Sequence, residues 1–157
     1  MAIDVGREAP DFTLKDPDNE DVSLSSFRGE RNVVLAFFPA AFSGVCTSQF
    51  TRFGEEEARY AGEGAQIIGV SVDNRHSLRA WGESLGLGDG VLLLSDFEPK
   101  GAVAKAYGVY RDDFGFAGRA TFVIDTNGIV RSAQVTSTPA DQPDEDEYFR
   151  ALSVCNA

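Results

Sequence analysis

Two continuous apolar runs constrain the fold of this 157-residue chain more than any other feature. They occupy residues 32–38 and 66–72, each about the length of a β-strand, with little alternation between polar and apolar side chains. Such runs are typical of central strands that are covered on both faces by helices. The intervening residues 44–61 have helical periodicity, with Phe50, Phe53 and Tyr60 on one face. We therefore expect a β-α-β unit at the centre of the molecule.

The remaining segments predict further elements around that unit. The order β-α-β-α, then β-β-α, indicates an α/β fold with a mixed central sheet flanked by helices, although the pattern leaves the strand order open. The length suits one domain over residues 1–157. The expected elements are an N-terminal hairpin at 12–24, a short helical turn at 25–29, a helix capped by Asp73 or Asn74 that carries Leu78, Trp81 and Leu85, a strand at 91–94, a helix at 102–107, strands at 121–125 and 129–135 around an Asn127-Gly128 turn, and a final helix that starts within 141–144.

Composition excludes several classes of function. Fourteen basic and 25 acidic residues give a net charge of −11, which disfavours nucleic-acid binding because phosphates would be repelled. The acidity, with only three lysines, would also fit a protein soluble in a high-salt cytosol. No run is long enough to span a membrane and the N-terminus lacks an apolar leader, so we expect a cytoplasmic protein that does not bind membranes. Two cysteines and one histidine, His76, do not form a disulfide scaffold or a metal site.

The segment from Pro39 to Cys46 joins the first apolar run to the predicted helix and places a cysteine in its first turn. Backbone N–H groups lack partners there, and the helix dipole is positive. Such a position favours the thiolate, which is the nucleophilic form of cysteine. Ser43, one turn earlier, supplies a hydroxyl group. These features predict a reactive cysteine, whereas a lone cysteine in an α/β core is more often a small buried hydrophobic residue.

The pattern Pro-x-x-x-Ser-x-x-Cys within residues 37–47 resembles the peroxidatic loop of peroxiredoxins, with Ser43 where the commonest family pattern has threonine. The resemblance covers nearly the whole chain and is closest to the one-cysteine, alkyl hydroperoxide reductase E type. It implies a thioredoxin-like fold with an N-terminal β-hairpin extension. The other segments similar to the family are Ala9-Pro10-Asp11-Phe12-Thr13-Leu14, Leu94-Ser95-Asp96-Phe97, Ala106-Tyr107-Gly108-Val109 and residues 119–125.

The resemblance implies a thiol-dependent peroxidase that reduces hydrogen peroxide and organic hydroperoxides through a sulfenic acid on Cys46. It implies that Arg119 stabilises the thiolate and polarises the O–O bond, that Ser43 hydrogen-bonds sulfur and peroxide, and that Pro39 stiffens and shields the loop. Arg119 precedes a predicted strand, which favours a place at the sheet end beside the cysteine helix, but spacing alone does not bring it to Cys46. Taken singly, these residues also fit an ion pair, a helix N-cap and a strand terminator.

The implied reaction needs no metal, flavin or haem. The expected reductant is a thioredoxin, a glutaredoxin-like protein or a small thiol, and the expected assembly is a homodimer or larger. Two other functions use the same cysteine. A thiol–disulfide oxidoreductase is disfavoured because Cys46-Thr47-Ser48-Gln49 lacks the second cysteine of a Cys-x-x-Cys pair. A non-enzymatic redox sensor or holdase remains compatible with the sequence.

Cys155 is the second cysteine and the third residue from the C-terminal end. Its position is faintly similar to the resolving-cysteine tail of two-cysteine peroxiredoxins, but the tail here is short. The sequence leaves open whether Cys155 resolves Cys46, within or between chains, or is a free packing residue.

Overall fold

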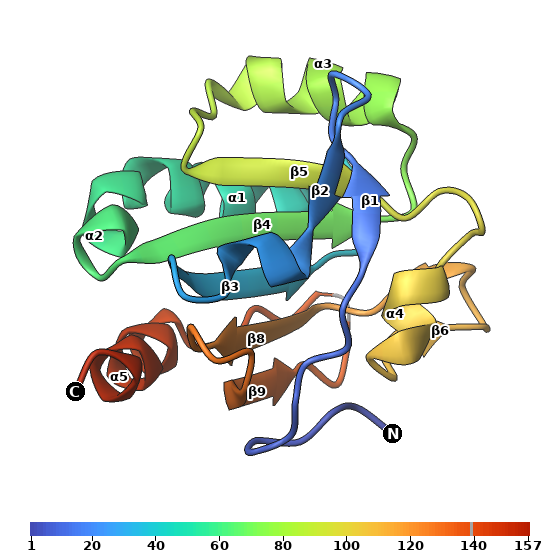
Figure 1. Ribbon diagram of the computed structural model, residues 1–157. Helices are drawn as coiled ribbons and strands as arrows, with labels where there is room; N and C mark the ends of the chain where they lie inside the picture. The colour runs from blue at the N-terminus through green and yellow to red at the C-terminus, as the bar shows by residue number, and fades with distance from the viewer. Residues whose placement is uncertain (139) are drawn as a thin grey trace.

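A seven-stranded sheet runs through the centre of the computed structural model, which describes residues 1–138 and 140–157 (Figure 1). Its strand order is β2-β1-β5-β4-β3-β8-β9, and β6 and β7 pair separately. The strands are β1 (Thr13–Lys15), β2 (Asp21–Ser23), β3 (Asn32–Phe37), β4 (Ala65–Ser71), β5 (Val91–Ser95), β6 (Tyr110–Arg111), β7 (Phe116–Ala117), β8 (Ala120–Ile124) and β9 (Val130–Val135). The helices are η1 (Leu24–Phe27), α1 (Gly44–Glu55), α2 (Glu57–Gly62), α3 (Arg75–Leu85), α4 (Ala102–Ala106) and α5 (Glu145–Cys155).

The sheet is mixed, as the order of elements predicts. Strands β3, β4 and β5 are parallel, whereas β8 runs antiparallel to β3. Every residue of β3 and β4 is buried, which explains why their sequences are apolar without alternation. This central position also determines where the chain leaves β3, because the connection to α1 must start at the edge where the parallel strands end.

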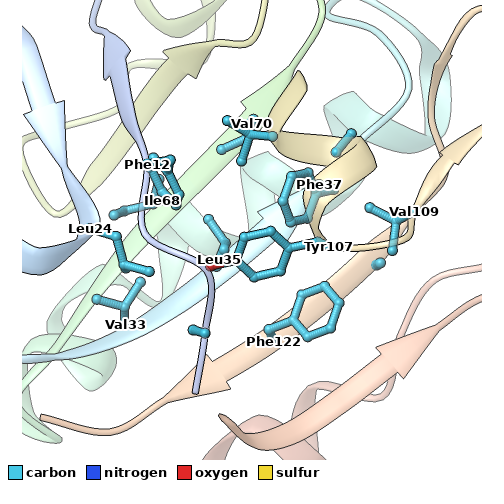
Figure 2. Close-up of a cluster of buried hydrophobic side chains, with 14 of the residues drawn as sticks. Phe12, Leu24, Val33, Leu35, Phe37, Ile68, Val70, Tyr107, Val109 and Phe122 are labelled. Carbon is cyan, nitrogen blue, oxygen red and sulfur yellow. The ribbon is translucent and has the colours of Figure 1, made fainter. Parts of the chain in front are cut away.

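Alternate side chains of β3 enter two separate cores. Val33, Leu35 and Phe37 face a cluster that includes Tyr107 and Phe122 (Figure 2). Val34, Ala36 and Phe38 face the other cluster, together with apolar side chains of α1, α2, α3 and α5. Burial of both faces supplies the main driving force for the sheet, at about 25 cal/mol per Å² of apolar surface. The second core also contains Cys46, so the cysteine shares a buried cluster with side chains of β3.

Two details differ from the sequence expectation. The helix expected over 44–61 is two helices, because the chain changes direction at Glu56. The change lets Glu57 Oε1 accept a hydrogen bond from the Gly90 N–H at 2.7 Å, ahead of β5. The small β6–β7 pair has no strand signal in the sequence, since each strand has only two residues.

Several local signals are confirmed. Asn74 caps α3 by accepting a hydrogen bond from the Ser77 N–H, and Asp144 caps α5 in the same way from the Asp146 N–H. The Asn127-Gly128 turn joins β8 to β9, with Gly128 at φ +80°, a conformation that favours glycine. None of the helices in the described part of the chain has the length and apolar character that a bilayer span requires.

Candidate active site

Cys46 is the third residue of α1 and follows the carboxyl end of β3. Ser43 takes the N-cap position with extended backbone, and the Thr47 N–H donates to its carbonyl at 2.9 Å. The N–H groups of Gly44, Val45 and Cys46 precede this first helical bond and point toward the helix start. They place partial positive charge at the start of the helix that carries the cysteine. Cys46 has no solvent-exposed surface.

The Arg119 guanidinium lies directly against this sulfur, with Nη2 3.2 Å from Cys46 Sγ. Sheet register brings the two together. Ala120 pairs with Phe37 across the antiparallel β8–β3 ladder, so the residue before β8 sits where β3 ends. Arg119 is 1% exposed, and a cation at that depth must be compensated by hydrogen bonds or an anion. A Cys46 thiolate is the anion that this geometry can stabilise.

Gln49 is a second described contact of the guanidinium, and the sequence analysis missed it. Its Oε1 accepts a hydrogen bond from Arg119 Nη1 at 2.6 Å. Gln49 lies one helical turn after Cys46 and is 5% exposed, so it shares the buried face of α1 with the sulfur. The available signal was a polar amide at a position three residues after Cys46, on a face otherwise occupied by Phe50 and Phe53.

Helix α5 contributes Tyr148 to the same buried cluster as Cys46. Its hydroxyl donates to Thr121 Oγ1 at 2.9 Å, two residues along the chain from Arg119. Burial raises the pKa of Tyr148 well above its ordinary value, so the phenol stays neutral and acts as a donor. The Tyr148 phenol is therefore a neutral hydrogen-bond donor and does not act as a base.

Ser43 and Pro39 shape the loop rather than contact the sulfur in this structure. The Ser43 hydroxyl donates to the Ala40 carbonyl at 3.0 Å, and among the described residues no hydrogen bond joins it to Cys46. It also makes no side-chain cap to α1, although it occupies the N-cap position. Pro39 is buried at the end of β3, where it rigidifies the chain. Phe42 lies between them at φ +68° and is 59% exposed.

Cys155 lies at the opposite end of the sheet from Cys46. Its neighbour Asn156 accepts a hydrogen bond from Asn32 Nδ2 at 2.9 Å, at the beginning of β3, where Figure 1 also places the C-terminus. Six residues of β3 span about 16 Å, whereas a disulfide requires Cα atoms about 4.4–6.8 Å apart. The structure therefore does not bring the two cysteines together within one chain.

Two further features bear on the chemistry of the cysteines. Burial, with a smaller contribution from Asp125, raises the pKa of the Cys155 thiol, which makes it a poor nucleophile at neutral pH. Both cysteines are free. Within residues 1–138 and 140–157, no group of three or more His, Cys, Asp or Glu side chains is arranged to hold a metal ion.

Comparison with known proteins assigns the family. Residues 5–133 match the AhpC/TSA family model. Alkyl hydroperoxide reductase E of Mycobacterium tuberculosis is 36% identical over 155 residues, which cover 99% of each chain. A thioredoxin peroxidase of Echinococcus granulosus is 33% identical, with 98% of this chain and 82% of the relative covered.

A solved structure agrees with these relatives. The reduced 2-Cys peroxiredoxin of Plasmodium vivax superimposes with a TM-score of 0.82 at 32% identity, covering 95% of this chain and 80% of that one. The agreement extends to the fold class, a thioredoxin-like mixed sheet flanked by helices. On this sequence and structural similarity the chain belongs to the AhpC/TSA family of peroxiredoxins, and it is a peroxidase that uses thiols to reduce peroxides in antioxidant defence.

Proposed function

We propose that Cys46 is the peroxidatic nucleophile and that Arg119 is the residue that activates both the sulfur and the peroxide. The observation that carries this proposal is the 3.2 Å contact between Arg119 Nη2 and Cys46 Sγ. Both residues are buried, so their mutual attraction is screened little by water. The guanidinium also offers further donors toward an oxygen atom that approaches the sulfur.

The proposed reaction is a two-electron transfer from sulfur to peroxide. The Cys46 thiolate attacks the nearer peroxide oxygen, and the S–O bond forms as the O–O bond breaks. The departing oxygen leaves as hydroxide or alkoxide and takes up a proton to give water or an alcohol. Cys46 is thereby oxidised to sulfenic acid. Arg119 and the first-turn N–H groups of α1 stabilise the negative charge that develops on the leaving oxygen.

Access to the sulfur requires a local movement of the loop around Phe42 and Gly44. Cys46 has no exposed surface, whereas Phe42 and Gly44 are exposed. A small displacement of these exposed residues would uncover the sulfur while Ala41 stays bonded to Asp73. In the open loop the Ser43 hydroxyl is close enough in the chain to exchange its Ala40 partner for the peroxide, and Pro39 limits the displacement.

The sulfenic acid is then reduced by thiols. One thiol displaces water from the Cys46 sulfur to form a mixed disulfide, and a second thiol releases the Cys46 thiolate. A thioredoxin, a glutaredoxin-like protein or a small thiol supplies these electrons; the name of the Echinococcus relative favours a thioredoxin. Cys155 would act in this step only between chains, because the geometry within one chain separates it from Cys46.

The preferred substrates, assembly and location are part of the same proposal. Hydrogen peroxide and organic hydroperoxides are both proposed substrates, and the name of the mycobacterial relative favours alkyl hydroperoxides. The exposed Phe42 beside the site supports contact with an organic group. A homodimer or larger assembly is proposed from the family resemblance. A cytoplasmic location is supported by two cysteines that both remain free thiols.

The test is the oxidation of Cys46 by peroxide. Stopped-flow kinetics measures its rate, and mass spectrometry identifies the product. Cys46→Ser should abolish peroxidase turnover, and Arg119→Ala should slow oxidation about 100- to 1000-fold, the typical effect of removing a donor to a developing oxyanion. Cys155→Ser is the matched control at the other cysteine and should keep wild-type oxidation of Cys46. Wild-type turnover in Cys46→Ser would refute the assignment.

A further inference from the structure

The loop that precedes Cys46 follows β3, and it is bonded to the loop that follows the neighbouring strand β4. Strands β3 and β4 are parallel, with Phe37 opposite Val70, so the chain leaves both strands side by side. The second of these loops carries Asp73. Its Oδ2 accepts a hydrogen bond from the Ala41 N–H at 2.8 Å. A carboxylate from one loop thus restrains the backbone of the other.

Asp73 is itself fixed by three further hydrogen bonds. The Ser71 hydroxyl donates to the same Oδ2 at 2.7 Å, and the Asp73 N–H donates to Ser71 Oγ at 3.2 Å. The Ser95 hydroxyl donates to the Asp73 carbonyl at 2.6 Å. Ser71 is fully buried at the end of β4. The last residue of β4 therefore orients the Asp73 carboxylate, and the last residue of β5 fixes its backbone.

The hydrogen bond between Ala41 and Asp73 is the main tie between the loop at residues 39–43 and the rest of the described structure. Among hydrogen bonds between described residues, the Ala41–Asp73 bond is the only one that ties residues 39–43 to a segment beyond the loop itself and the neighbouring ends of β3 and α1. The next residue, Phe42, has φ +68°, which a bulky side chain adopts only where the surroundings impose it. Ser43 is then the N-cap of α1, three residues before Cys46.

We propose that Asp73 is a positioning residue for peroxide reduction, which holds the Ala41 backbone so that the first turn of α1 keeps the Cys46 sulfur in place against Arg119. The inference rests on the proposed role of Cys46. Asp73 acts through the Ala41 backbone and does not touch the reacting atoms. Its contribution is alignment, and misplacement of a reacting group by about 1 Å can slow a reaction about 100-fold.

A matched pair of variants isolates this effect. Asp73→Ala and Asp73→Asn both remove the negative charge, but only asparagine keeps a side-chain oxygen that can accept from the Ala41 N–H and the Ser71 hydroxyl. The backbone bond from Ser95 survives in both variants. We expect Asp73→Ala to lower the second-order rate of Cys46 oxidation by hydrogen peroxide about 10- to 100-fold. Asp73→Asn should restore the rate to within about threefold of wild type, since the acceptor is retained.

A purely structural role would change the melting temperature without this pattern of rescue. Wild-type oxidation in Asp73→Ala, or equal loss in both variants, would overturn the inference. If Asp73→Ala does not fold, Ser71→Ala keeps the inference testable, because it removes a support of the carboxylate while leaving Asp73 in place. Its oxidation rate should fall at least threefold, and an unchanged rate would also overturn the inference.

The experiment separates this inference from the proposed function. Inactive Cys46→Ser together with unaffected Asp73 variants removes only the positioning role. Active Cys46→Ser removes the proposed nucleophile, whatever the Asp73 variants do.

Discussion

At the scale of residues, the candidate site contains a buried pair, Arg119 and Cys46, in which each side chain offsets the cost of burying the other. A buried guanidinium is costly unless an anion or acceptors surround it, and a buried thiolate is costly unless donors surround it. Arg119 and Cys46 meet both conditions at 3.2 Å. Gln49 Oε1 accepts a hydrogen bond from Arg119 Nη1 at 2.6 Å, so its amide contributes to the orientation of the guanidinium relative to the sulfur.

Gln49 therefore offers a test of this alignment. Gln49→Leu has similar bulk but removes the acceptor for Arg119 Nη1, so oxidation of Cys46 should slow about 10- to 100-fold. Gln49→Glu keeps an acceptor and should stay within about tenfold of wild type. Stopped-flow oxidation rates, with melting temperatures as the control for folding, check both variants. Equal rates for Gln49→Leu and wild type would contradict the role.

At the scale of elements, acidic side chains fix several loops and turns of the chain by accepting backbone hydrogen bonds. Asp73 does so beside the site, and Asp125 does so in the β8–β9 turn. Asp125 Oδ1 accepts from the N–H groups of Asn127 and Ile129, and its Oδ2 accepts from Arg131 Nε at 2.7 Å. Such bonds define the tight turn that the Asn-Gly sequence predicts.

The Asp125 side chain in the β8–β9 turn should make the free energy of unfolding depend on pH. Burial raises the pKa of Asp125, but the N–H groups of Ile129 and Asn127 and the Arg131 guanidinium outweigh it, so the pKa lies below the ordinary 3.8. The folded state then binds fewer protons than the unfolded state. The stabilisation is complete above about pH 5 and is lost as the pH falls through 3.8 toward the folded pKa.

Urea unfolding measured from pH 6 to pH 2.5 checks this expectation. Asp125→Asn should lower the free energy of unfolding by about 1 kcal/mol at pH 6 and should flatten its acid dependence. Asp113→Asn is the matched control, because the pKa of Asp113 is also lowered, by Arg111, but this ion pair is exposed and contributes little. The same acid dependence in Asp125→Asn and wild type would exclude the turn as its source.

At the scale of the whole molecule, the residues of the candidate site lie at one end of the central strands, whereas the net charge affects the stability of the whole fold. The carboxyl ends of β3 and β4 and the start of β8 bring Cys46, Asp73 and Arg119 to one edge. A net charge of −11 on 157 residues creates repulsion that opposes compactness. Salt screens this repulsion, because the Debye length falls from about 30 Å at 0.01 M to about 3 Å at 1 M.

Added salt should therefore stabilise the protein. We expect the midpoint of urea unfolding to rise between 0.01 M and 1 M sodium chloride, and to rise further at higher salt if the acidity is an adaptation to a salty cytosol. An equal osmotic strength of an uncharged solute is the control for effects other than screening. No rise up to 1 M salt would show that surface repulsion does not limit stability.

The sequence by itself determined the apolar strands, the Asn-Gly turn and the cysteine in the first turn of a helix. It narrowed one helix cap to Asp73 or Asn74 and the start of the last helix to residues 141–144. These features depend on local periodicity and on hydrogen bonds between near neighbours, so a window of a few residues contains their cause. Only the tertiary structure decided the strand order, the break at Glu56 and the separation of Cys155 from Cys46. The same holds for the contacts of Gln49 and Asp73, because each depends on which distant segments the sheet places side by side. Arg119 lies 73 residues from Cys46 along the chain, and only the antiparallel pairing of β8 with β3 brings its guanidinium to the sulfur.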